Sequence, residues 1–100
     1  MRIPQKQALR MIQEDTELII LDVRTRDEYI MGHIKGAINI PNETISNTKP
    51  DLLPDTDKTI LVYCQGGMRA GSAVRKLKRM GYKHAYNMGG ITSWTGEVVR

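Results

Sequence analysis

The hydrophobic residues of this chain are grouped into short unbroken runs separated by longer stretches of mixed polarity. Two runs, at residues 18–23 and 60–63, have the length of strands, and the first is interrupted only by Asp22. Continuous runs of this length are typical of strands buried on both faces of a parallel sheet. Shorter apolar segments at residues 37–40 and 85–88 predict two more strands, and Pro41 ends the first of these.

Between the predicted strands, apolar residues recur with the spacing of amphipathic helices. This spacing predicts helices at residues 4–13, 26–31 and 70–80. Pro4 suits a first helical turn and Thr25 is a suitable cap, while glycines at positions 32 and 81 follow the second and third helices. Strands that alternate with helices predict an α/β fold in which helices cover both faces of a parallel sheet.

Two segments have no strong periodicity. Residues 42–58 contain two prolines and four acidic residues, and they predict a surface connection with one helical turn around Ile45. The glycines at 89 and 90 are expected to start a terminal turn or helix that runs through Trp94. The sequence contains no repeat and no linker, so we expect residues 1–100 to form a single domain.

Composition and charge limit the classes of partner. The N-terminal residues contain no apolar signal region and no run has the length of a membrane span, so we expect a cytoplasmic protein with no membrane partner. The net charge of +4 suits a small anionic ligand or an acidic protein. Aromatic residues make up only 5% of the chain and no long basic block exists, so no nucleic-acid partner is expected.

The single cysteine, Cys64, lies between the second apolar run and a glycine-rich turn that leads into a predicted helix. The start of a helix presents free backbone N–H groups and the positive end of the helix dipole. Glycines allow several N–H groups to point at one anion, and Arg69 adds a positive charge. Such surroundings favour a thiolate, the nucleophilic form of cysteine. The alternative is a buried cysteine that acts as a small hydrophobic residue.

Three segments carry motifs that resemble a known family. The longest covers residues 22–41 and reads DVRTRDEYIMGHIKGAINIP. The second, residues 60–70, is the strand, cysteine loop and helix start, ILVYCQGGMRA, and the third, residues 87–94, is NMGGITSW. In this order and spacing the chain resembles the rhodanese-like sulfurtransferase family from residue 3 to about residue 96.

The resemblance implies a three-layer α/β domain with a central parallel sheet of about five strands flanked by helices. It also implies that Cys64 is the catalytic nucleophile, which attacks the outer sulfur of a donor such as thiosulfate and holds that sulfur as a persulfide. A thiophilic acceptor, such as cyanide, a thiol or a protein, then takes the sulfur. This is covalent catalysis in two stages, and it needs no cofactor.

The residues after Cys64 form the expected site for a small anionic sulfur donor. Backbone N–H groups could surround the persulfide and the departing oxyanion; these belong to Gln65, Gly66, Gly67, Met68 and Arg69. The Arg69 guanidinium could bind the donor's oxygens with two hydrogen bonds. The side chain of Met68 could line the mouth of the pocket.

Polar residues near the first strand are expected to support this loop. Asp22 is expected either to accept hydrogen bonds from the loop N–H groups or Arg69, or to have a structural role. Arg24 and Glu28 are four residues apart, which favours an ion pair or a helix cap, with orientation of Arg24 or Arg69 by Glu28 as the alternative. His33 is expected to stabilise a turn. Two distant histidines and one cysteine do not have metal-ligand spacing, so no metal is expected.

The length of the loop distinguishes sulfur transfer from related chemistry. Arg69 follows Cys64 after four intervening residues, whereas relatives that take phosphate or arsenate have a longer loop. Gln65 occupies a position where thiosulfate-using relatives often have a basic residue, so a protein-bound persulfide from a desulfurase is an alternative donor. Two other functions stay open: a protein-to-protein persulfide carrier and a non-catalytic rhodanese-like binding module. We expect a monomer.

Overall fold

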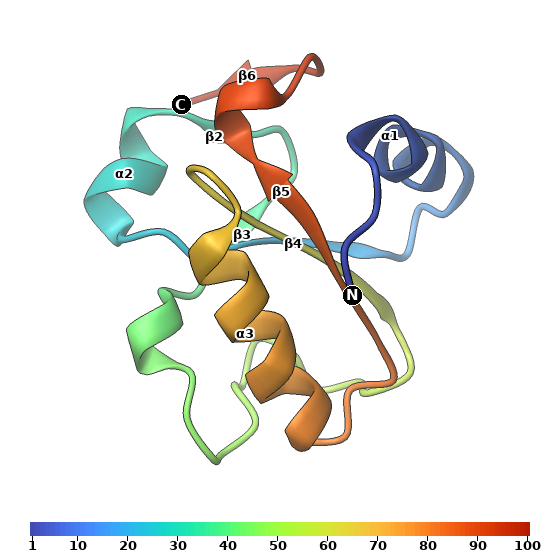
Figure 1. Cartoon of the computed structure of the whole chain (residues 1–100), viewed down its shortest axis with the longest axis vertical. Helices are drawn as coiled ribbons and strands as arrows, with labels where there is room; N and C mark the ends of the chain where they lie inside the picture. Colours follow the sequence, from blue (N-terminus) through green and yellow to red (C-terminus); the bar gives the residue numbers. More distant parts are fainter.

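Four parallel strands form the central sheet, in the order β3-β1-β4-β5 (Figure 1). The computed structural model describes residues 1–100. The strands of the sheet are β1 (Ile19–Asp22), β3 (Ile38–Asn39), β4 (Thr59–Cys64) and β5 (His84–Gly90). The helices are α1 (Gln5–Glu14), α2 (Arg26–Met31) and α3 (Met68–Arg79). The α/β class and the parallel sheet predicted from the sequence are therefore confirmed.

Alternation along β4 divides the core into two layers. Ile60, Val62 and Cys64 point to the face covered by α3, where they join a cluster of 14 buried residues. Leu61 and Tyr63 point to the opposite face, where they pack in a second cluster of eight buried residues with Ala8 of α1. Burial of each large aliphatic side chain contributes about 1.5–3 kcal/mol. The strand is buried on both faces, which explains why its sequence is an unbroken apolar run.

The sheet has four strands, whereas the family resemblance implies about five. At the β5 edge the N-terminal segment makes a single parallel bridge, between Arg2 and Asn87. Its hydrogen bonds run from Ile3 N to Asn87 O (2.9 Å) and from Asn87 N to Met1 O (2.8 Å). Pro4 follows at once, and because proline has no N–H the pairing stops there and α1 begins.

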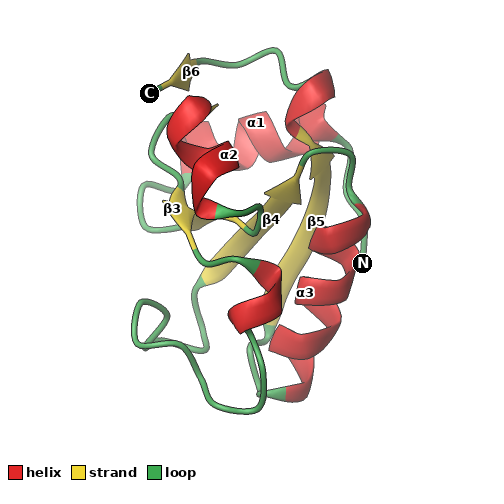
Figure 2. Cartoon of the chain, turned by 90° about the vertical axis from the view of Figure 1, so that its left-hand side faces the viewer, coloured by secondary structure: helices red, strands yellow, loops and turns green.

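Several boundaries differ from those predicted. Helix α3 begins at Met68 rather than Ala70, because Gly67 adopts a left-handed conformation (φ 112°) and leads directly into the first turn. Strand β5 continues through Gly90, and the terminal turn is a short 3-10 helix, η2 (Ile91–Ser93). Figure 2 shows the arrowheads of β4 and β5 at the end of the molecule where α2 lies.

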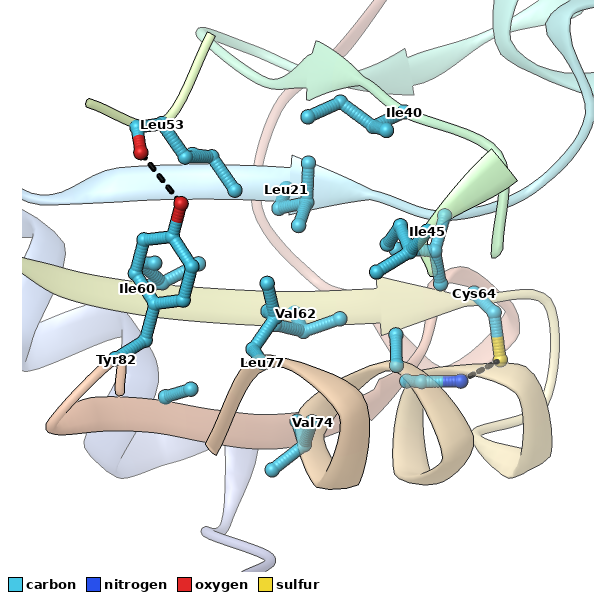
Figure 3. Close-up of a cluster of buried hydrophobic side chains, with 14 residues drawn as sticks. Leu21, Ile40, Ile45, Leu53, Ile60, Val62, Cys64, Val74, Leu77 and Tyr82 are labelled. Carbon is cyan, nitrogen blue, oxygen red and sulfur yellow. Dashed lines mark hydrogen bonds between the residues drawn. The ribbon is translucent and has the colours of Figure 1, made fainter. Parts of the chain in front are cut away.

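The connection at residues 42–58 is not wholly on the surface. Its helical turn, η1 (Asn42–Thr44), ends just before Ile45. The turn therefore lies slightly earlier in the chain than the predicted turn around Ile45. Ile45 and Leu53 are buried against the α3 side of the sheet (Figure 3). The Leu53 carbonyl also accepts a 2.5 Å hydrogen bond from the Tyr82 hydroxyl, which fixes this connection to the end of α3.

A second, two-stranded sheet escaped prediction. Strand β2 (His33–Ile34) pairs antiparallel with β6 (Val98–Val99), which joins the C-terminal segment to the turn after α2. Two-residue strands are too short to show a period in the sequence. No helix of the structure combines the length and the apolar character needed to span a membrane.

Candidate active site

Cys64 is the last residue of β4, and its sulfur is directed at the first turn of α3 (Figure 3). The Sγ atom accepts hydrogen bonds from the N–H groups of Gly67 (2.9 Å) and Ala70 (3.4 Å). Both donors lie at the N-terminus of a 12-residue helix, the positive end of its dipole. This arrangement stabilises negative charge on the sulfur, as in the predicted nucleophile.

The loop between β4 and α3 carries further free donors. The N–H groups of Gln65 and Gly66 donate to no acceptor in the protein, and both residues are exposed. Cys64 itself is fully buried, and the hollow that the structure contains, about 170 Å³, lies elsewhere, between α1, β2 and residues 94–97. A donor therefore reaches the sulfur only when groups of this loop shift.

The end of β5 holds the loop from behind. Gly90 lies so close to it that a Cβ atom at position 90 would be 2.1 Å from the Gln65 carbonyl oxygen and 2.7 Å from the Gly66 Cα. Thr92 donates to the same Gln65 oxygen from its N–H (3.4 Å) and its hydroxyl (3.2 Å). Asn87 Nδ2 donates to the Gly67 carbonyl (3.0 Å). Glycine at position 90 is thus required for the loop to occupy its place.

Gly90→Ala should displace the Cys64 loop and lower both activity and stability. The new methyl group would overlap backbone atoms that cannot rotate away, an overpacking that costs about 1–3 kcal/mol. Thermal unfolding and the rate of sulfur transfer measure the two effects. Gly71→Ala is the matched control, because its Cβ meets the Asn87 Nδ2 atom at an ordinary 3.5 Å within α3. That variant should be more stable than the wild type by about 0.5–1 kcal/mol. Equal behaviour of the two variants would contradict the packing argument.

Arg69 is held by a carboxylate of α2. Its Nη1 and Nη2 atoms donate to Glu28 Oε1 (2.6 Å) and Oε2 (3.0 Å). Glu28 also closes a capping box, since Thr25 N donates to Glu28 Oε1 and Glu28 N donates to Thr25 Oγ1. The hydrogen bonds from Arg69 lower the pKa of Glu28 to about 2, and the same bonds raise the pKa of Arg69. The pair connects α2 to the first turn of α3.

Glu28→Gln should remove an acid-dependent part of the stability. The folded pKa of about 2 lies below the ordinary value of 4.5, so the contribution of the ion pair is complete above about pH 4.5 and is lost as the pH falls toward 2. The difference in urea midpoint between wild type and Glu28→Gln should therefore shrink between pH 5 and pH 2. Glu43→Gln removes an exposed carboxylate with no ion-pair partner and serves as the control. A difference independent of pH would contradict the assignment.

A buried ion pair lies on the other face of the sheet. Arg24 donates from Nε (3.1 Å) and Nη2 (2.7 Å) to the carboxylate of Asp22, which is fully buried. Asp22 Oδ2 also accepts from the Tyr63 hydroxyl (2.7 Å), and that hydroxyl accepts from Ile34 N (3.0 Å). Burial raises the pKa of Tyr63, so the hydroxyl keeps the proton that it donates. Arg24 reaches the loop through a 3.4 Å contact between Nη1 and Gln65 Oε1.

Comparison with known proteins identifies the family. The model of the rhodanese-like domain matches residues 4–97. The chain belongs to the rhodanese-like domain family. The chain is 39% identical over 71 residues to the thiosulfate sulfurtransferase PspE of Escherichia coli (strain K12), an alignment that covers 71% of this chain and 68% of PspE.

This rhodanese-like domain is also similar to part of a larger enzyme and to a solved structure. It is 36% identical over 86 residues to the tRNA uridine(34) hydroxylase of Erwinia tasmaniensis, covering 81% of this chain but only 25% of that enzyme. The structure described as a rhodanese with anions from E. coli superimposes with a TM-score of 0.75 at 35% identity, covering 82% of this chain and 96% of that chain.

The rhodanese-like domain assembles most of the residues singled out in the sequence. Cys64, the loop glycines and Arg69 meet at the start of α3, and Glu28 orients Arg69, one of the predicted alternatives. Of the loop N–H groups expected around the sulfur, Gly67 donates to it, and Ala70, one residue beyond the expected set, also does. The side chain of Met68 is 90% exposed beside the loop.

The contacts of Asp22, of the Arg24 and Glu28 pair and of His33 can be compared with those expected. Asp22 accepts hydrogen bonds from Arg24 and Tyr63 rather than from the loop N–H groups or Arg69, because alternation along β1 turns it to the face opposite Cys64. Of the two expected roles of Asp22, the structure therefore shows the structural one. Arg24 and Glu28 form no ion pair, since each is bound to another partner, but the helix cap given as the other expectation is present in the Thr25–Glu28 capping box. The expected turn-stabilising bond of His33 is confirmed, from Nδ1 to the Tyr29 carbonyl at 2.9 Å.

Some residues of the site were missed in the sequence. Tyr63 precedes Cys64, and its hydroxyl donates a hydrogen bond to Asp22 of the buried ion pair. The sequence clue was a single hydroxyl in the otherwise aliphatic run of residues 60–63. Asn87 and Gly90 hold the loop from 20 or more residues away, a relation that no local pattern reveals. No group of three or more His, Cys, Asp or Glu side chains is arranged to hold a metal ion.

Proposed function

We propose that this rhodanese-like domain transfers a sulfane sulfur from thiosulfate, or a similar small anionic donor, to a thiophilic acceptor through a persulfide on Cys64. The main support is that the Sγ atom of Cys64 accepts hydrogen bonds from two backbone N–H groups at the N-terminus of α3. The similarity to PspE, a thiosulfate sulfurtransferase, supports thiosulfate as the donor.

The reaction proceeds in two displacements at sulfur. The Cys64 thiolate attacks the outer sulfur of thiosulfate, a new S–S bond forms, and the old S–S bond breaks as sulfite leaves with the electron pair. The N–H groups that face Sγ, together with the free N–H groups of Gln65 and Gly66, stabilise the charge on the persulfide and on sulfite. An acceptor such as cyanide or a thiol then attacks the outer sulfur and regenerates the thiolate.

A thiolate attacks without giving up a proton, so the first displacement needs no general base. This agrees with the site, where no histidine contacts Cys64. Arg69 is paired with Glu28 and lies in the first turn of α3, so its part is to fix the loop against α2. The buried Asp22–Arg24 pair fixes the far side of the same loop through Gln65.

Intact mass after incubation with thiosulfate tests this function directly. We expect a gain of one sulfur atom that is lost on reduction. Since Cys64 is the sole cysteine of the chain, blocking it with an alkylating reagent before incubation should prevent the gain. Absence of the added sulfur in the unblocked, folded protein would contradict use of thiosulfate.

A protein-fed persulfide carrier is the second candidate. The exposed Met68 beside the loop and the basic residues of α3 favour it, since both are features of a docking surface; the basic residues are Arg75, Lys76, Lys78 and Arg79. Here the mass gain should occur with a persulfidated desulfurase rather than thiosulfate, and its rate should fall with added salt. A domain that takes sulfur from neither donor would be a non-catalytic binding module.

A further inference from the structure

Three arginines lie around the Cys64 loop, and they differ in their partners. Arg69 is paired with Glu28 and Arg24 with Asp22, so the positive charges of these two arginines are compensated. Arg2 has no carboxylate within ion-pair distance and makes no side-chain hydrogen bond. It is the uncompensated cation in contact with the loop.

The guanidinium of Arg2, an exposed residue, lies against two glycines. A Cβ atom at Gly67 would be 2.7 Å from Arg2 Nη1, and one at Gly89 would be 3.0 Å from Arg2 Nη2. The absence of side chains at both positions makes room for the guanidinium. Gly67 is the residue whose N–H donates to the Cys64 sulfur, so the free cation lies against the backbone that contacts the nucleophile.

The backbone of Arg2 is fixed as well. Its parallel bridge to Asn87 anchors it to β5. The side chain of Asn87 extends the same anchor to the loop, since Nδ2 donates to the Gly67 carbonyl (3.0 Å) and Oδ1 accepts from Gly89 N (2.8 Å). One buried asparagine therefore holds the N-terminal segment, the loop and the end of β5 together. The backbone from which the Arg2 side chain extends is therefore held beside the loop before any ligand binds.

We propose that Arg2 is the residue that selects an anionic sulfur donor, by binding the sulfonate oxygens of thiosulfate and then the sulfite that leaves. A guanidinium presents two parallel N–H donors that match two oxygens of such a group, and a charge-assisted pair of this kind is strong and directional. The assignment rests on the proposed function for the identity of the donor. It assigns the anion to a segment outside the cysteine loop.

Arg2→Gln tests the assignment by a split between KM and kcat. The variant should raise the KM for thiosulfate about ten-fold and change kcat less than about two-fold, because the lost contact acts on binding of the anion. Arg10→Gln is the matched control, since it removes the same charge from the exposed surface of α1 and makes no contact with the loop. Arg2→Lys should recover part of the affinity, because an ammonium group keeps the positive charge but lacks the two parallel N–H donors of a guanidinium. Equal KM values for Arg2→Gln and Arg10→Gln would overturn the proposal.

Binding of sulfite to the reduced protein provides a readout without turnover. Titration followed by NMR or calorimetry should give a dissociation constant about ten-fold weaker for Arg2→Gln than for wild type and Arg10→Gln. Sulfite that binds Arg2→Gln as tightly as wild type, or that binds neither, would contradict the role of Arg2. Arg2-dependent sulfite binding in a protein that gains no sulfur from thiosulfate would instead retain the anion site and reject the proposed reaction.

Discussion

Cys64→Ser should lower the rate of sulfur transfer from thiosulfate to cyanide by at least about a thousand-fold while the domain stays folded. A serine hydroxyl is not ionised at neutral pH and cannot hold the transferred sulfur as a persulfide. The hydroxyl oxygen can still accept the hydrogen bonds that Gly67 N and Ala70 N now make to the sulfur. We therefore expect the loop to stay in place. Initial rates and thermal unfolding, measured on the same preparation, check the two parts.

The stability measurement decides how a loss of rate is read. Cys64 belongs to the buried cluster under α3, so a polar replacement there costs about 1 kcal/mol of unfolding free energy (Figure 3). A variant that is folded and inactive supports the covalent route. A folded Cys64→Ser variant that retains more than a few per cent of the wild-type rate would show that the sulfur does not pass through this residue.

The strands of the central sheet and the cysteine loop could be predicted from the sequence because their signals are local. Strand β4 is buried on both faces, so its apolar run is unbroken, and the glycines after Cys64 mark the turn into α3. The capping box at Thr25 is likewise contained within four residues. In each case the physical cause lies within one element, and the pattern of that element records it.

The partners of the polar groups could not be predicted in the same way. Arg69 meets Glu28 across 41 residues, and Asn87 meets Gly67 across 20, because the topology places the ends of adjacent parallel strands together. For Asp22 the sequence left two roles open, and the side chain bonds Arg24 and Tyr63 on the face opposite Cys64. The contact of Arg2 with the loop depends on an edge bridge one residue long.

At the carboxyl end of the sheet, the cysteine and the buried ion pair lie on opposite faces. Cys64 points to α3, and its sulfur accepts a hydrogen bond from Gly67 N at the start of that helix. Tyr63, the preceding residue, points to the other face, where its hydroxyl donates to Asp22. Gln65 joins the two faces, since its side chain contacts Arg24 and its carbonyl accepts from Thr92. A disturbance of the buried ion pair is thus transmitted to the cysteine loop by a single residue.

Asp22→Ala should destabilise the domain by about 3–5 kcal/mol, a large part of the stability that a domain of this size has. The carboxylate is fully buried and accepts hydrogen bonds from the Arg24 guanidinium, the Arg24 N–H and the Tyr63 hydroxyl. Removing it leaves Arg24, a residue that is only 4% exposed, without its counter-charge. Urea unfolding at pH 7 measures the loss, and activity should fall with it because Gln65 loses a fixed partner.

Two further variants separate the buried charge from the loss of a contact. Asp57→Ala breaks an ion pair with Lys83 in which both side chains are more than half exposed, so its unfolding midpoint should barely move. Adding Arg24→Met to Asp22→Ala should recover part of the stability, because the unpaired cation is then gone. A double variant less stable than Asp22→Ala alone would show that the remaining contacts of Arg24, to the Gly32 carbonyl and to Gln65, outweigh the cost of its unpaired charge.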